Sequence, residues 1–128
     1  MNIKNIFTEL QNAPIDASAN IRVIQLTGDA TLAVFAAEIS PKTALKPHYH
    51  SVGIETYQIL QGEGIMKVGV VQNGSVVWNE SFATKTGDCF TIPEGHVHQI
   101  INESEDTLLA IFSCPENHLS SDRFFVGE

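Results

Sequence analysis

Two histidines and a glutamate stand close together in the stretch 47–62, PHYHSVGIETYQILQG, at spacings that suit metal binding. His48 and His50 are two residues apart, so on an extended strand both imidazoles point to the same face. Glu55 follows a short turn that Gly53 permits, and a returning strand can bring its carboxylate to the same point. Two neutral imidazoles and one carboxylate supply half or more of the inner ligand shell of a divalent metal ion.

A fourth ligand has to come from elsewhere in the chain, and the best candidate is His98. It lies in a second ordered stretch, 87–102, GDCFTIPEGHVHQIIN, in which glycine, proline, histidine and asparagine stand at regular intervals. With a divalent ion, three imidazoles and one carboxylate carry a net charge near +1 and leave up to two coordination positions open on an octahedral metal.

The two stretches together resemble the paired signature motifs of the cupin superfamily. The matching residues are His48, His50, Glu55 and Gly62 in the first motif, and Gly87, Pro93, Gly95, His98 and Asn102 in the second. One position departs from the pattern, because Lys42 replaces the glycine that usually opens the first motif; that glycine serves a turn and binds no metal. The resemblance implies an antiparallel jelly-roll β-barrel (the double-stranded β-helix) that holds one divalent metal ion through His48, His50, Glu55 and His98.

The ligand set leaves the metal and the reaction open, since histidine nitrogens accept iron, zinc, manganese, nickel and copper. Our first hypothesis is a metal-dependent enzyme that acts on a small organic molecule, with dioxygenase-like chemistry ahead of isomerase, decarboxylase or lyase chemistry. The alternative is a non-catalytic module that binds or senses a small, sugar-like ligand and carries a bound metal.

Other polar residues compete for a place in the pocket. Tyr57 shares the inward strand face of Glu55, where it is either a substrate contact or, more in keeping with its type, a core aromatic. His96 is a candidate for the pocket rim or for an exposed turn, and His118, in the tail, is expected to be solvated. Of the two arginines, Arg22 is the better candidate for an inward cation, although a surface position suits it equally; Arg123 lies outside both motifs.

We expect eight or nine short strands to position these residues. Apolar runs recur along the chain between turns rich in Gly, Asn and Asp, as in ANIRVIQL, ATLAVFAAEI, IMKVGVV and TLLAIFS. The strongest hairpin signal is Asn73-Gly74, which is flanked by β-branched residues. Alternation places Met66, Val68, Phe90, Ile92 and Ile100 inside and Lys67 outside. This pattern predicts an all-β, antiparallel barrel.

The N-terminal segment 1–19 is expected to pack on the barrel or on a dimer partner, and 20–128 to form a single barrel domain. Within the segment, Ile3, Ile6, Phe7 and Leu10 suit either a short helix stopped by Pro14 or an added edge strand. Paired apolar residues on both faces of several strands, such as Leu108 and Leu109, predict a homodimer formed through an outer sheet.

Composition narrows the class of protein. The net charge of −8 over 128 residues argues against binding to nucleic acid or to anionic membranes. No apolar run reaches the length of a membrane span, and the N-terminus lacks the apolar core of a signal peptide, so a cytoplasmic protein is expected. Cys89 and Cys114 have no metal-binding spacing and are expected to be free thiols.

Overall fold

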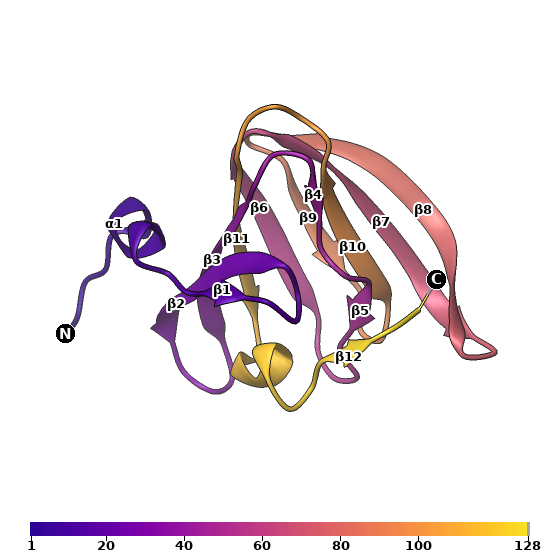
Figure 1. Ribbon diagram of the computed structural model, residues 1–128. Helices are drawn as coiled ribbons and strands as arrows, with labels where there is room; N and C mark the ends of the chain where they lie inside the picture. Colours follow the sequence, from indigo (N-terminus) through magenta and orange to yellow (C-terminus); the bar gives the residue numbers. More distant parts are fainter. Residues whose placement is uncertain (128) are drawn as a thin grey trace.

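Two antiparallel sheets face each other and enclose an apolar core in the computed structural model, which describes residues 1–127 (Figure 1). In strand order, the first sheet contains β1 (Ile15–Asp16), β2 (Ile21–Gly28), β3 (Ala33–Ile39), β11 (Leu108–Cys114), β6 (Glu55–Gln61) and β9 (Cys89–Ile92). The second contains β12 (Phe124–Phe125), β5 (His48–Tyr49), β10 (Val97–Asn102), β7 (Glu63–Gln72) and β8 (Ser75–Lys85), with β4 (Thr43–Ala44) paired to β10. This is the all-β, antiparallel barrel that the strand pattern predicts.

The predicted hairpin lies between β7 and β8, the two longest strands. Asn73 and Gly74 both adopt positive φ, 54° and 80°, which is the conformation that a tight two-residue hairpin turn requires. The turn between β2 and β3 follows Gly28, and a register shift between Gln25 and Thr27 interrupts the pairing of these two strands.

Side chains from both sheets meet in one core. The residues predicted to point inward are buried there, among them Met66 at 0% exposure and Ile100 at 1%, while Phe90 is half-buried against the cluster. Lys67 points outward, and its ammonium group lies 4.4 Å from the ring centroid of Trp78. Burial of each large apolar side chain stabilises the fold by roughly 1.5–3 kcal/mol.

The outer face of the first sheet is covered by α1 (Ile6–Gln11) of the same chain. The side chain of Asn5 caps this helix by accepting hydrogen bonds from the backbone N–H groups of Phe7 and Thr8. Leu10 is buried in a cluster of apolar residues on β2, β3 and β11. Both expected forms of the N-terminal segment therefore occur, a helix and then the edge strand β1. Helix α1 of the same chain therefore covers part of the apolar surface that we assigned to a dimer interface. The homodimer stays a prediction.

The C-terminal residues Pro115–Phe125, which we call the strap, cross one end of the barrel (Figure 1). The strap contains the 3₁₀ helix η1 (Glu116–Leu119) and β12, which pairs with β5. Phe124 and Phe125 also contact the barrel through their rings: Phe124 stacks on Tyr49 with centroids 5.2 Å apart, and the ring of Phe125 lies 5.9 Å from that of His48, while the two side chains remain 43% and 42% exposed. Across residues 1–127, no helix combines the length and the apolar character needed to span a membrane.

Candidate metal centre

Four side chains from three strand regions converge at the end of the barrel that the strap crosses. His48 on β5 and His98 on β10 are directly paired residues of neighbouring strands, and ligand nitrogens of His48, His50 and His98 lie within 4.8 Å of one another. Glu55, the first residue of β6, faces them from the other sheet. Its Oε2 lies 3.1 Å from Nε2 of His50 and its Oε1 lies 3.5 Å from Nε2 of His98. The structure thus brings together all four residues that the sequence nominates.

Backbone carbonyls fix the tautomer of each imidazole. Each Nδ1 lies within hydrogen-bond distance of one carbonyl oxygen: His48 at 2.9 Å from Lys46, His50 at 2.7 Å from Asp122, and His98 at 3.2 Å from His96. A carbonyl oxygen only accepts, so Nδ1 carries the proton and Nε2 presents a lone pair to the centre.

Two of these lone pairs have no partner within the protein. Nε2 of His50 and Nε2 of His98 are fully buried and make no hydrogen bond; the contacts to Glu55 are close but lack hydrogen-bond geometry. Buried polar atoms normally find partners, so these orphaned nitrogens need an explanation. Bonds of about 2.1 Å to a divalent ion place neighbouring octahedral ligands about 3 Å apart, which is near the nitrogen–oxygen distances found here. The donor set and its spacing fit a divalent metal ion.

The charges of the cluster also suit a metal. Burial and the neighbouring His98 lower the pKa of His48 to about 3, so this imidazole is neutral at pH 7. Burial acts to raise the pKa of Glu55, but the hydrogen bond from His118 and the close rings of His50 and His98 outweigh it and hold the pKa well below its usual range. A neutral imidazole and an ionised carboxylate are the forms that bind metal.

His118 belongs to this centre, and the expectation that it is solvated was wrong. Its side chain is 0% exposed on η1, and its ring stacks on His50 with centroids 4.0 Å apart. Nδ1 lies 3.1 Å from Oε2 of Glu55, and Nε2 lies 2.7 Å from the carbonyl oxygen of Val52. Burial acts to lower the pKa of His118, but these two contacts raise it overall. Both partners are acceptors, so the ring donates at both nitrogens and is an imidazolium.

Asp122, also on the strap, fixes the loop between His50 and Glu55. Its carboxylate accepts hydrogen bonds from the backbone N–H and the hydroxyl of Ser51, both at 2.7 Å, and from the N–H of Val52 at 3.1 Å. Its carbonyl oxygen is the acceptor for Nδ1 of His50. Sequence reasoning missed Asp122, and no local pattern marks it.

Tyr57 is a core aromatic that also borders the centre. Its ring stacks between Phe90 and Phe112, with centroids 5.3 and 5.6 Å away. Burial and the adjacent Glu55 raise its pKa well above the usual value, so the phenol stays protonated. Cys114 is buried beside the same carboxylate. Burial and the charge of Glu55 raise the pKa of its thiol. Cys89 is exposed, and both cysteines are free.

The remaining candidates lie apart from the centre. His96 is half-buried, with Nδ1 3.1 Å from the carbonyl oxygen of Glu94, and does not line the inner cavity. Arg22 is half-buried, donates to the carbonyl oxygen of Ala13 at 2.5 Å and lines a different hollow, so it is not the inward cation. Arg123 on the strap takes that place.

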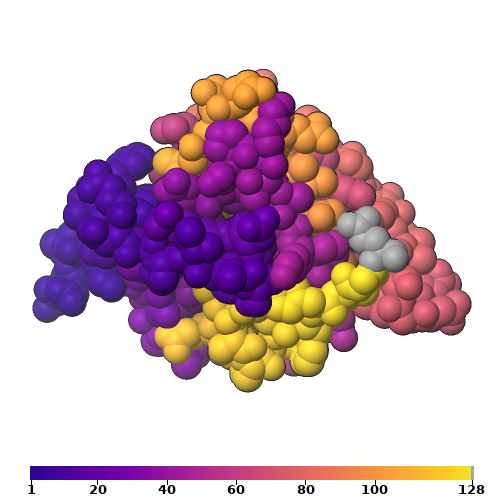
Figure 2. Space-filling model, viewed as in Figure 1, coloured from indigo at the N-terminus to yellow at the C-terminus, as the bar shows by residue number. Residues whose placement is uncertain are grey.

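The cluster opens into a narrow inner chamber rather than onto the surface. The chamber has a volume of about 20 Å³ and is lined by His48, His50, Glu55 and Tyr57, by apolar residues of both sheets, and by Arg123. Figure 2 shows the indigo N-terminal segment and the yellow strap meeting over this end of the molecule. A chamber of this size has room for about one water molecule.

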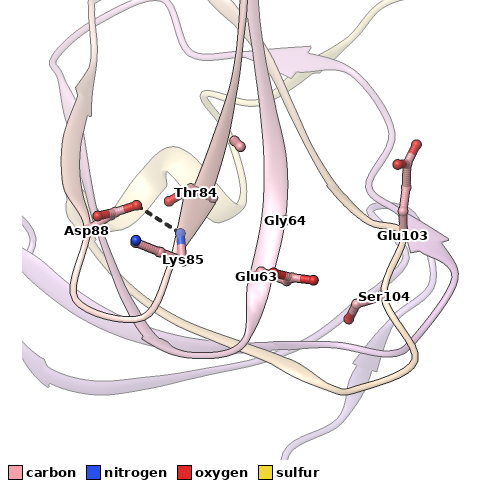
Figure 3. A pocket seen from close by; sticks show the side chains of 8 residues that line it. Glu63, Gly64, Thr84, Lys85, Asp88, Glu103 and Ser104 are labelled. Carbon is pink, nitrogen blue, oxygen red and sulfur yellow. Dashed lines mark hydrogen bonds between the residues drawn. The ribbon is translucent and has the colours of Figure 1, made fainter.

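A larger hollow of about 550 Å³ lies at the other end of β6, beyond Gly62. Asp88 and Glu103 stand on opposite sides of it (Figure 3), and its carboxylates do not converge. Within residues 1–127, only His48, His50 and His98, and His50, Glu55 and His118, form clusters of three or more metal-ligand atoms. The chemistry of the molecule is therefore concentrated at the strap end.

Comparisons with known proteins agree with this fold. Germin-like protein 12-1 of Oryza sativa subsp. japonica is 31% identical over 120 residues, which are 83% of this chain and 52% of that protein, so the chain spans about half the length of this relative. A double-stranded β-helix protein of Klebsiella pneumoniae superposes with a TM-score of 0.71 at 18% identity, over 100% of this chain and 99% of that one.

Oxalate decarboxylase of Bacillus subtilis, a protein with Mn(II) centres, superposes with a TM-score of 0.68 at 17% identity, over 91% of this chain and 30% of that one. These structural likenesses show the fold. The family model for the cupin domain matches residues 35–114, which contain all four predicted ligands and the intervening strands. On this match, the chain belongs to the cupin family.

Proposed function

We propose that this protein is a metal-dependent enzyme that binds one divalent transition-metal ion through His48, His50, Glu55 and His98 and acts on a small organic molecule. The observation that carries the proposal is the pair of buried, unpartnered Nε2 atoms beside an ionised carboxylate. The Mn(II) centres of the oxalate decarboxylase support manganese as one ion to test, together with iron, zinc, nickel and copper.

A bound ion would supply Lewis-acid or redox chemistry to a molecule in the chamber. The residues of the chain do the rest. His118 holds the carboxylate of Glu55 in place, and the apolar walls exclude water. Tyr57 keeps its proton and can donate a hydrogen bond to a bound molecule.

Dioxygenase-like chemistry is the first reaction class to test, because an enclosed apolar chamber protects reactive species from water. Isomerase, decarboxylase or lyase chemistry comes second. A sugar-binding module receives less support, since the chamber walls offer few hydrogen-bond partners for hydroxyl groups.

The test begins with metal content. We would purify the protein without a histidine tag and measure bound metals by plasma mass spectrometry, beside His50→Ala and a matched control, His96→Ala, which removes a half-buried histidine away from the chamber. We expect about one ion per chain in the wild type and in the control, and loss of the ion in His50→Ala. Oxygen uptake with a panel of small substrates follows. Equal metal content in His50→Ala and the wild type would refute the assigned centre.

A further inference from the structure

The inner chamber is lined by the histidine–glutamate cluster and by one cationic side chain, that of Arg123. The other lining residues are mostly apolar, with Ile39 and Ile100 among them. Among the lysines and arginines of residues 1–127, Arg123 alone lines this chamber. A single cation in an apolar chamber of an acidic protein needs an anionic partner.

Arg123 is held close to the cluster and is largely withdrawn from solvent. Its side chain is only 12% exposed, and the guanidinium carbon lies 5.2 Å from the ring centroid of Phe125. The ring of Phe125 in turn lies 5.9 Å from that of His48. The ring of Phe125 therefore lies near both the guanidinium and the predicted metal ligand His48.

The present partner of Arg123 is a carboxylate from the N-terminal segment. Nη1 donates to Oδ2 of Asp16 at 2.6 Å, while Nη2 donates to the hydroxyl of Ser18 at 3.2 Å. Asp16 thus takes one arm of a fork that can hold both oxygens of a carboxylate. This pair joins the N-terminal segment to the strap where the two meet over the chamber (Figure 2). The closed chamber has room for about one water, so binding of an organic ligand requires its walls to move as well as Asp16 to leave the guanidinium.

We propose that Arg123 is the carboxylate-binding group of the chamber, and that the ligand is a small organic acid with a short apolar body. Its carboxylate replaces that of Asp16 on the guanidinium, its body lies along the apolar walls, and its other end faces the histidine cluster. Binding of the carboxylate by Arg123 does not depend on the proposed function. Only the contact between the other end of the ligand and the metal centre rests on it.

The test compares two probes of equal shape and different charge, butyrate and butyramide. Titrations followed by ¹H–¹⁵N correlation spectra suit a chain of 128 residues and report the fold of every variant at the same time. For the wild type we expect butyrate to bind at least about tenfold more tightly than butyramide, since a hydrogen bond to a charged group has that strength. Arg123→Gln should abolish this preference. Asp16→Asn, which removes the competing carboxylate, should strengthen butyrate binding several-fold.

Arg22→Gln is the matched control, because it removes the other arginine, which is half-buried and does not line the chamber. We expect it to bind butyrate as the wild type does. Equal affinity for the two probes in the wild type, or an unchanged preference for butyrate in Arg123→Gln, would overturn the inference. Weaker butyrate binding in Asp16→Asn, with its spectrum intact, would do the same.

Each titration is run on metal-free and on zinc-loaded protein, after metal content has been measured. A protein that binds no metal but prefers butyrate through Arg123 refutes the proposed function and supports this inference. A protein that binds metal through the four ligands but does not distinguish the two probes supports the proposed function and refutes this inference.

Discussion

Acidification should destabilise the metal-free protein through one buried residue, His48. Burial and the neighbouring His98 lower the pKa of His48 from 6.5 to about 3 in the folded state. Below pH 6.5 the unfolded chain therefore binds a proton at this residue that the folded chain does not accept until about pH 3. Because the unfolded state binds more protons than the folded state in this pH window, the free energy of unfolding falls as the pH falls through it.

The size of the effect follows from the two pKa values. At pH 7 both states are nearly free of this proton, and the penalty is close to zero. At pH 5 the folded imidazole is still neutral, while the unfolded one lies 1.5 pH units below its pKa of 6.5, which corresponds to about 2 kcal/mol. Glu55 adds nothing in this window: its folded pKa is depressed, so its contribution is lost only as the pH falls below 4.5. A loss of about 2 kcal/mol is a large share of the stability of a small domain.

The assay is urea unfolding of metal-free protein at pH 7 and at pH 5, beside His48→Gln, which keeps an amide donor but does not titrate. Other groups titrate in both proteins, so the difference between them isolates His48. We expect the wild type to lose about 2 kcal/mol more than the variant between the two pH values. Equal losses would refute the reasoning, because His48 would then not be a neutral buried base.

Substitutions at three further positions test the residues that support the fold and the centre. His118→Leu, which removes the cationic donor from Glu55, should destabilise the metal-free protein by about 3–5 kcal/mol in urea unfolding, and His118→Gln by clearly less; similar small losses would contradict a buried charge pair. The buried amide of Asn102 donates to three backbone carbonyl oxygens, so Asn102→Asp, which puts a carboxylate there, should lower the melting temperature more than Asn102→Ala does. Lys42 adopts φ 57°, so Lys42→Gly should change the stability by less than about 1 kcal/mol and Lys42→Val should cost about 1–2 kcal/mol; equal effects would show that φ is not the constraint.

Local patterns sufficed to place His48 and His50 on one face and to predict most strands, whereas His98 was nominated through the resemblance to the cupin motifs. His48 and His50 share a face because alternate residues of an extended segment do so, and Asn73-Gly74 fixes a hairpin by its own conformational preference. The turn that opens the first motif is also read correctly, since Lys42 adopts the positive φ that a glycine at this place would favour. In each case, the information lies within a few residues of the feature that it predicts.

The strap could not be predicted in this way. His118 reaches Glu55 across 63 positions of sequence, and Asp122 reaches His50 across 72. Periodicity says nothing about such contacts, because they depend on where the barrel ends and on how the chain returns over it. From the sequence alone, a histidine in a polar tail is expected to be solvated. Only the path of the folded chain brings His118 against the carboxylate of Glu55.

That placement changes the electrostatics that the motifs alone suggest. Three neutral imidazoles and one carboxylate give a site of about +1 with a divalent ion; the imidazolium of His118 adds a positive charge, which the Asp122 carboxylate 4.0 Å away offsets in part. A buried site with excess positive charge favours an anionic ligand over a neutral one. The guanidinium of Arg123, which lines the same chamber, acts in the same direction once Asp16 leaves it. Both cationic groups come from the strap, so the segment that closes the chamber also contributes to its charge.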